Sequence, residues 1–193
     1  MEKLMKAAKG LDTFFRVLFW ILVVFGVLMT GGIIYMAVHG NTDMLSVDMG
    51  QVMVQLKQGI AIRYEPAGLM ILALVQLGLG LTISFLGIGM LRSILQPMKE
   101  GQPFAHPVAK GLRKLALLTL VGGGVMAACQ VIWQKIMLSA VDVYTLFDAS
   151  KVSGITVNFR YDLTFLLVSM ILELLSFVFR YGEELQRQSD ETL

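Results

Sequence analysis

Four long apolar runs, separated by short polar segments, constrain this chain more than any other feature of its sequence. They cover residues 17–38, 67–91, 115–134 and 163–179. Each is close to the about 20 residues that an α-helix needs to cross about 30 Å of hydrocarbon. Backbone polar groups in lipid must be satisfied within the protein, which a helix does by itself. We therefore predict an all-α integral membrane protein with four transmembrane helices.

The rest of the chain is too short to hold a separate soluble domain. Of the 193 residues, 56% are hydrophobic and 16% are charged, which is more apolar than an average soluble domain. The segments between the apolar runs are an inner loop, 92–114, and two outer loops, 39–66 and 135–162. None is long enough for a hydrophobic core of its own. We predict a single membrane domain, 1–193, with the lipid bilayer as its main partner.

Basic residues are more than twice as numerous on one side of the predicted spans as on the other. The richer side holds Lys3, Lys6, Lys9, Arg16, Arg92, Lys99, Lys110, Arg113, Lys114, Arg180 and Arg187. The poorer side holds Lys57, Arg63, Lys135, Lys151 and Arg160. Because loops rich in Lys and Arg stay in the cytoplasm, both termini and the inner loop are predicted to be cytoplasmic.

The two outer loops share a motif. Residues 59–65 read GIAIRYE, and residues 154–162 read GITVNFRYD, which is the same pattern with one strand period added. Each loop also has an earlier β-prone stretch, 52–56 or 143–147. We predict small extracytoplasmic β-hairpins that pack on each other, since a single hairpin is marginal in water. The repeat divides the chain into two tandem helical hairpins, related by an axis along the membrane normal.

One acidic residue falls inside the predicted spans, and it carries the candidate intramembrane site. Asp162, Ser169, Glu173, Ser176 and Arg180 recur at helical intervals and share one predicted helix face. The outer-loop repeat aligns Gln76 with Glu173. An ionised Glu173 facing lipid would cost about 2.5–3.5 kcal/mol, so we expect it to face the bundle. Two interpretations stay open: a structural hydrogen bond, or a proton or cation site.

Small residues predict where the helices touch. In the third span these are Gly122, Gly123, Gly124, Ala127 and Ala128. Small side chains let membrane helices approach closely, so this stripe is predicted to be a packing seam.

The sequence holds no pattern typical of an enzyme site. His39 and His106 lie a membrane apart and cannot share a metal ion within one chain. Neither a Ser/His/Asp set nor a phosphate-binding glycine loop is present. We therefore predict no catalytic residues, no metal, no cofactor and no direct binding of nucleic acid.

The inner loop predicts a turn followed by an amphipathic helix. The second helix is expected to stop before Pro97, and residues 101–103 to turn the chain. Pro107 suits the start of a helix whose apolar and basic faces differ. The apolar face comprises Val108, Leu112 and Leu115, and the basic face comprises Lys110, Arg113 and Lys114. This segment is either a connector lying along the membrane or a docking surface for a cytosolic partner.

Short motifs at this loop and at the C-terminus resemble a bacterial family catalogued as domain of unknown function 2975. They are KEGQPF at 99–104, LRKL at 112–115, FRYGEELQ at 179–186 and DETL at 190–193. The resemblance implies a four-helix protein of the bacterial cytoplasmic membrane without an assigned activity. It also implies a small helix-turn-helix regulator as a cytosolic partner, because the genes of such proteins often lie beside a gene that encodes one.

The predicted function is that of a non-enzymatic bacterial membrane protein that senses or tethers such a regulator. Its expected docking residues are Gly101, Pro103, Phe104, Arg113, Gly182, Glu184 and Leu185. The alternative is a small proton- or cation-coupled transporter or channel centred on Glu173. Its expected polar residues are Glu173, Gln76, Ser169, Ser176 and Arg180. Either function is compatible with a homo-oligomer.

Overall fold

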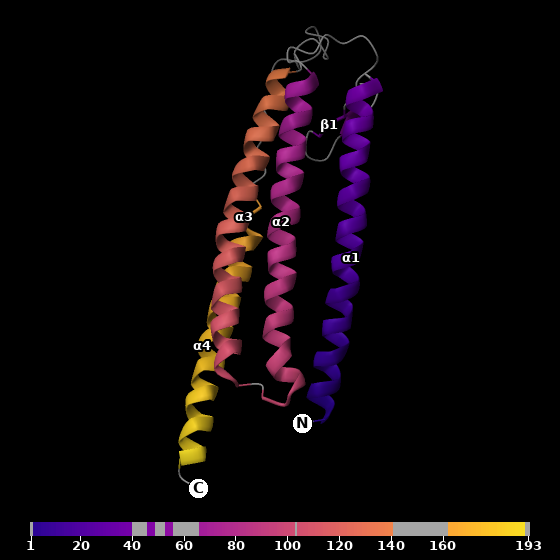
Figure 1. The fold of residues 1–193 in the computed structure, drawn as a ribbon. Helices are drawn as coiled ribbons and strands as arrows, with labels where there is room; N and C mark the ends of the chain where they lie inside the picture. Colours follow the sequence, from indigo (N-terminus) through magenta and orange to yellow (C-terminus); the bar gives the residue numbers. More distant parts are fainter. Residues whose placement is uncertain are drawn as a thin grey trace. The chain divides into compact units, whose positions relative to one another are not determined.

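Four long helices account for most of the chain in a computed structural model. The structure describes residues 2–39, 46–48, 53–55, 66–102, 104–140 and 162–191, and the statements below refer to these residues. The helices are α1 (Glu2–His39), α2 (Pro66–Lys99), α3 (His106–Ala140) and α4 (Thr164–Glu191) (Figure 1). Two short strands, β1 (Ser46–Asp48) and β2 (Met53–Gln55), lie between α1 and α2 in the sequence.

All four helices are long and apolar enough to cross a membrane. The candidate spans are Met5–Tyr35, Met70–Lys99, His106–Ile136 and Thr164–Ser189. Their large apolar side chains are widely exposed, with Leu28 at 68% and Met170 at 73% of full exposure. A continuous apolar surface of this kind is unfavourable in water and favourable in lipid. The prediction of an all-α protein with four membrane-spanning helices is confirmed at this level.

β1 and β2 form a short antiparallel ladder, with Ser46 opposite Gln55 and Asp48 opposite Met53. β2 falls within the stretch 52–56 that the sequence predicted to be β-prone. The predicted partner strand of that stretch, 59–65, lies outside the described residues, as do 143–147 and 154–161 in the other outer loop. The two packed hairpins therefore stay a prediction.

The chain forms two units. The first contains Met1–Gly26, Leu79–Val125 and Leu163–Leu193, and the second contains Val27–Gly78 and Met126–Asp162. The first unit thus holds one part each of α1, α2 and α3 together with α4. The second holds the remaining parts of α1, α2 and α3 with the β1–β2 ladder. Every side-chain contact discussed below lies within the first unit.

The core of the first unit is formed by α2 and α3, with α4 packed against it. Its buried residues are Ile94, Val108, Leu112 and Leu115, and Val108 is fully buried. Leu172 and Phe179 of α4 pack on this cluster. The three basic residues of the same α3 segment, Lys110, Arg113 and Lys114, are exposed. The predicted apolar and basic faces of this segment are confirmed, and the segment is continuous with the third span.

The end of α2 differs from the prediction, because the helix continues through Pro97 to Lys99. A proline lacks the N–H that would bond the carbonyl of residue 93, so the helix passes through Pro97 with one internal hydrogen bond fewer. Gly101 terminates the helix instead, with φ of 82°. The backbone N–H of Gly101 donates to the Met98 carbonyl, and that of Gln102 donates to the Pro97 carbonyl. This pair of bonds is a Schellman cap, which requires a residue that tolerates positive φ.

Candidate functional site

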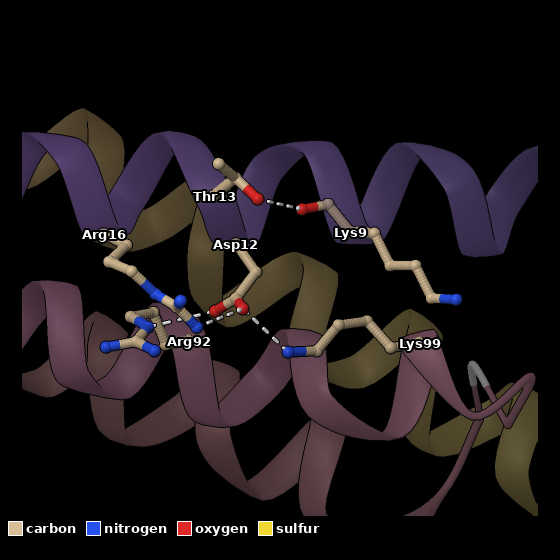
Figure 2. Close-up of polar contacts among 6 residues, drawn as sticks. All are labelled: Lys9, Asp12, Thr13, Arg16, Arg92 and Lys99. Atoms are coloured by element: carbon tan, nitrogen blue, oxygen red, sulfur yellow. Dashed lines mark hydrogen bonds and ion pairs between the residues drawn. The ribbon is translucent and has the colours of Figure 1, made fainter.

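A buried acid on α1 holds the N-terminal part of that helix to the end of α2. The Asp12 side chain is only 11% exposed. Its carboxylate accepts a hydrogen bond from Arg92 Nε at 3.0 Å and another from Lys99 Nζ at 2.9 Å. Arg16 lies one helical turn away, with its guanidinium 3.9 Å from the same carboxylate. Figure 2 shows all three cations directed at Asp12. Such charge-assisted bonds are shorter and stronger than neutral ones.

Sequence reasoning missed Asp12, because it treated this part of the chain only as a basic tail. The available signal was the spacing of Asp12 from Ala8 and Phe15, apolar residues four positions before it and three after it on the same helix face. An acid on the apolar stripe of a helix needs a buried partner. The basic inner loop, predicted on the same side of the membrane, offered cations from another helix.

Two of the motif segments meet where Phe104 packs on α4. The ring of Phe104 lies against that of Phe179, with centroids 5.7 Å apart. A Cβ atom at position 182 would lie 2.6 Å from the Phe104 ring, so any larger residue there would force the ring to move. The predicted docking residues Phe104 and Gly182 are therefore brought together, and both serve internal packing. Pro103, which precedes Phe104, lies outside the described residues.

Polar contacts join α3 and α4 along the same seam. The Ser176 hydroxyl donates to the carbonyl of Ala109 at 2.9 Å. His106 Nδ1 lies 3.0 Å from Glu183 Oε1, and Arg113 Nε lies 3.5 Å from Glu173 Oε1. The two helices are thus antiparallel and in close register, with the first residue of α3 beside Glu183.

The predicted intramembrane residues divide between two places. Ser169 and Ser176 are buried, and the Ser169 hydroxyl donates to the Leu166 carbonyl at 2.8 Å. Glu173 is 36% exposed and pairs with Arg113, a cation that the sequence placed in the inner loop. Asp162 precedes α4 and does not share its helix face. Gln76 belongs to the second unit, so its predicted contact with Glu173 stays a prediction.

An open groove of about 710 Å³ lies between α3 and α4. It is lined by His106, Ala109, Lys110, Arg113, Glu173, Ser176, Phe177, Arg180, Tyr181, Glu183 and Glu184. The groove therefore contains most of the predicted polar residues of α4, together with two predicted docking residues, Arg113 and Glu184. Its walls combine charged groups with two exposed aromatic rings.

Each acid of this groove lies beside a basic side chain. Glu173 pairs with Arg113, Glu183 with His106, and Glu184 with Arg187 at 2.9 Å. Within the described part of the chain, Lys110 and Arg180 have no acid partner. Among the described residues, no group of His, Cys, Asp and Glu is arranged to hold a metal ion. With three carboxylates, three Lys or Arg side chains and two aromatic rings, the lining supports the non-covalent binding of a group with polar and apolar parts.

Comparison with known proteins gives no relative: no protein-family model, curated protein or solved structure matches the chain. The resemblance to domain of unknown function 2975 therefore rests on the short motifs alone. The fold supports the coarser statement that this is a four-helix protein with four candidate membrane spans.

Proposed function

We propose that this chain is a non-enzymatic bacterial membrane protein that tethers or senses a cytosolic partner, a helix-turn-helix regulator, through the end of α4. The observation that carries the proposal is the length of α4. Glu183 contacts the first residue of α3, and the helix then continues for two turns to Glu191. Figure 1 shows this end of α4, in yellow, running past the start of α3. Residues 181–191 are called the α4 end below.

The α4 end exposes apolar side chains among charged ones. Tyr181 and Leu185 are both exposed, and Leu185 is at 49%. Around them lie Glu184 and Arg187, which bond to each other one turn apart. An exposed leucine beside an aromatic ring and charged groups is typical of a protein-binding surface.

The predicted docking residues have two kinds of role in this proposal. Gly101, Phe104, Arg113 and Gly182 fix the turn and the position of α4 through their internal contacts. Glu184 and Leu185 are exposed, so both can contact a partner directly. In this proposal, some residues of the motifs that resemble domain of unknown function 2975 position α4, and others contact the partner.

The alternative function, a transporter centred on Glu173, has less support. A proton or cation site needs a carboxylate that can exchange its ion. The carboxylate of Glu173 instead lies beside the guanidinium of Arg113, and it faces a groove that is open at the side. A structural ion pair between α3 and α4 accounts for the residue.

The proposal requires the α4 end to be cytoplasmic, which thiol labelling in whole cells tests. Cysteine at Ile62 or Val157, in a Cys129→Ser background, should react with an impermeant reagent added outside. Both positions lie outside the described residues, so this expectation comes from charge distribution alone. Cysteine at Leu185 should react only after the membrane is permeabilised. The reverse pattern would invert the orientation and remove the cytosolic partner.

Site-specific photocrosslinking tests the binding surface itself. A photoreactive residue replacing Leu185 in cells is expected to crosslink a cytosolic protein, which mass spectrometry identifies. Leu11 on α1 is the matched control, since it is a leucine of nearly equal exposure, 47%, outside the proposed surface. The variant Leu185→Gln should lower recovery of the same protein by about tenfold, the effect of losing one good interface anchor.

Two results would contradict the proposal. One is an identical set of crosslinked proteins from positions 185 and 11. The other is full recovery of the partner from a chain that carries Leu185→Gln and lacks residues 187–193. Leu11→Gln should leave recovery unchanged, which separates loss of the surface from a general loss of apolar character.

A further inference from the structure

We propose that the groove between α3 and α4 binds the headgroup phosphate of an anionic phospholipid, with Lys110 and Arg180 as its cationic ligands. The inference is independent of the proposed function, because it requires only that these helices lie in a bilayer. It rests on the charges in the groove, on their depth in the membrane and on the apolar wall beside them.

The first support is that two of the three Lys and Arg side chains lining the groove belong to no ion pair among the described residues. Glu173 lies beside Arg113, Glu183 beside His106, and Glu184 beside Arg187, which also contacts Glu191. Lys110 and Arg180 line the same groove and are exposed, without an acid partner among the described residues. An incoming phosphate could therefore bond to both cations without displacing an existing ion pair. Basic grooves between membrane helices commonly bind anionic headgroups.

The second support is the level of these two residues. Arg180 directly follows the apolar run 163–179, and Lys110 lies just over one turn before the run that begins at Leu115. The bond between Ser176 and Ala109 fixes the register of α3 against α4. Lys110 and Arg180 are therefore held near the same membrane boundary, which is where phosphate groups lie.

The third support is the apolar wall that continues from the groove toward the hydrocarbon. Phe177 and Tyr181 line the groove, and both rings are exposed. Leu174, one turn deeper on α4, is exposed as well. Aromatic rings are favoured at the membrane interface, where one end is wet and the other apolar. A lipid uses both parts of this surface, whereas a soluble phosphate would use only the cations.

Native mass spectrometry of the purified full chain tests the proposal. The delipidated protein is offered equal amounts of phosphatidylglycerol and phosphatidylcholine, and the first bound lipid is counted. The parent chain should prefer phosphatidylglycerol by about thirtyfold, given the usual contribution of two basic residues near a membrane surface. The double variant Lys110→Ala/Arg180→Ala should show a preference near unity.

The matched control is Lys9→Ala/Lys114→Ala, which removes the same charge from two exposed lysines that do not line the groove. It should keep the preference of the parent. A parent without preference, or a control that loses as much as the test variant, would overturn the proposal. Because all four side chains are exposed, folding should be retained, as circular dichroism checks. If the double variant does not fold, Lys110→Glu alone must abolish the preference.

A competition arm separates a lipid from a free anion. Inorganic phosphate and glycerol phosphate, each in excess, should leave the bound phosphatidylglycerol in place, because they lack acyl chains to cover Phe177. Displacement by either soluble anion would show that the groove selects phosphate and not a lipid, and would overturn the assignment.

Discussion

Replacing Asp12 by alanine is expected to lower the free energy of unfolding of the chain by about 2–3 kcal/mol. The carboxylate is nearly buried and bonds to both Arg92 and Lys99. Without it, two cations would lie close together with no anion between them. The effect falls below that of a fully buried pair because Arg92 and Lys99 are themselves 39% and 25% exposed. Titration with dodecyl sulfate in mixed micelles, followed by circular dichroism, measures it.

Arg16→Ala is the matched control, since Arg16 contacts the same carboxylate from an exposed position, at 3.9 Å. Its cost should be below about 0.5 kcal/mol, as for other surface pairs. Asp12→Asn keeps the shape and removes the charge, so it should be nearly as harmful as alanine. The double variant Asp12→Ala/Lys99→Ala should lose less stability than the sum of the losses in the two single variants, because both single changes remove the same ion pair. Equal effects for Asp12→Ala and Arg16→Ala would show that the buried contacts are not what stabilises this end.

The membrane-spanning helices could be predicted because their signal is local. Each apolar run can be recognised as a membrane span from its own length and composition, without knowledge of its neighbours. The buried face of Val108, Leu112 and Leu115 was equally readable, since helical spacing separates it from the basic residues beside it. The residue at which α2 ends was harder to predict from the sequence. Pro97 is a strong stop signal by itself, but Gly101 one turn later satisfies the last carbonyls and sets the boundary.

The ion pairs could not be predicted because they depend on which helices meet. Asp12 and Lys99 are far apart in sequence, as are Arg113 and Glu173. For Glu173, the sequence predicted a polar partner but aligned it with Gln76 through the outer-loop repeat. The antiparallel register of α3 and α4, set by the seam at Ser176, instead brings Arg113 within reach. A repeat in sequence gives equivalent positions, whereas a contact requires a particular packing.

The basic residues of the inner loop thereby acquire separate roles. In the sequence they form one positive segment that indicates orientation. In the structure Arg92 and Lys99 hold α1 through Asp12, and Arg113 holds α4 through Glu173. Lys110 stays available at the groove. Basic residues that set the orientation in the membrane can therefore also form ion pairs within the protein. The motif residues 99–104 and 112–115 accordingly serve packing as well as charge.

The largest steric effect is expected at Gly123, on the seam between α3 and α4. A Cβ atom there would overlap the Cβ and ring atoms of Phe165 on α4. Because the overlap includes the Cβ of Phe165, rotation of that side chain cannot relieve it, and α4 must move. Gly123→Ala should therefore lower the free energy of unfolding by about 1–3 kcal/mol, the usual cost of overpacking. The same titration in mixed micelles measures this loss.

The neighbouring glycine supplies the control. A Cβ atom at Gly124 would meet the tip of the Phe165 ring at 3.9 Å, which is an ordinary contact. Gly124→Ala should thus change stability by no more than about 1 kcal/mol, and in the favourable direction, because alanine is the better helix former. Small residues at 122–124 were predicted as one packing seam, but only those facing a neighbour need to be glycine. Equal behaviour of the two variants would mean that α3 and α4 do not approach through Gly123. The groove depends on the same register of α3 and α4, so its lining residues would then have to be reassigned.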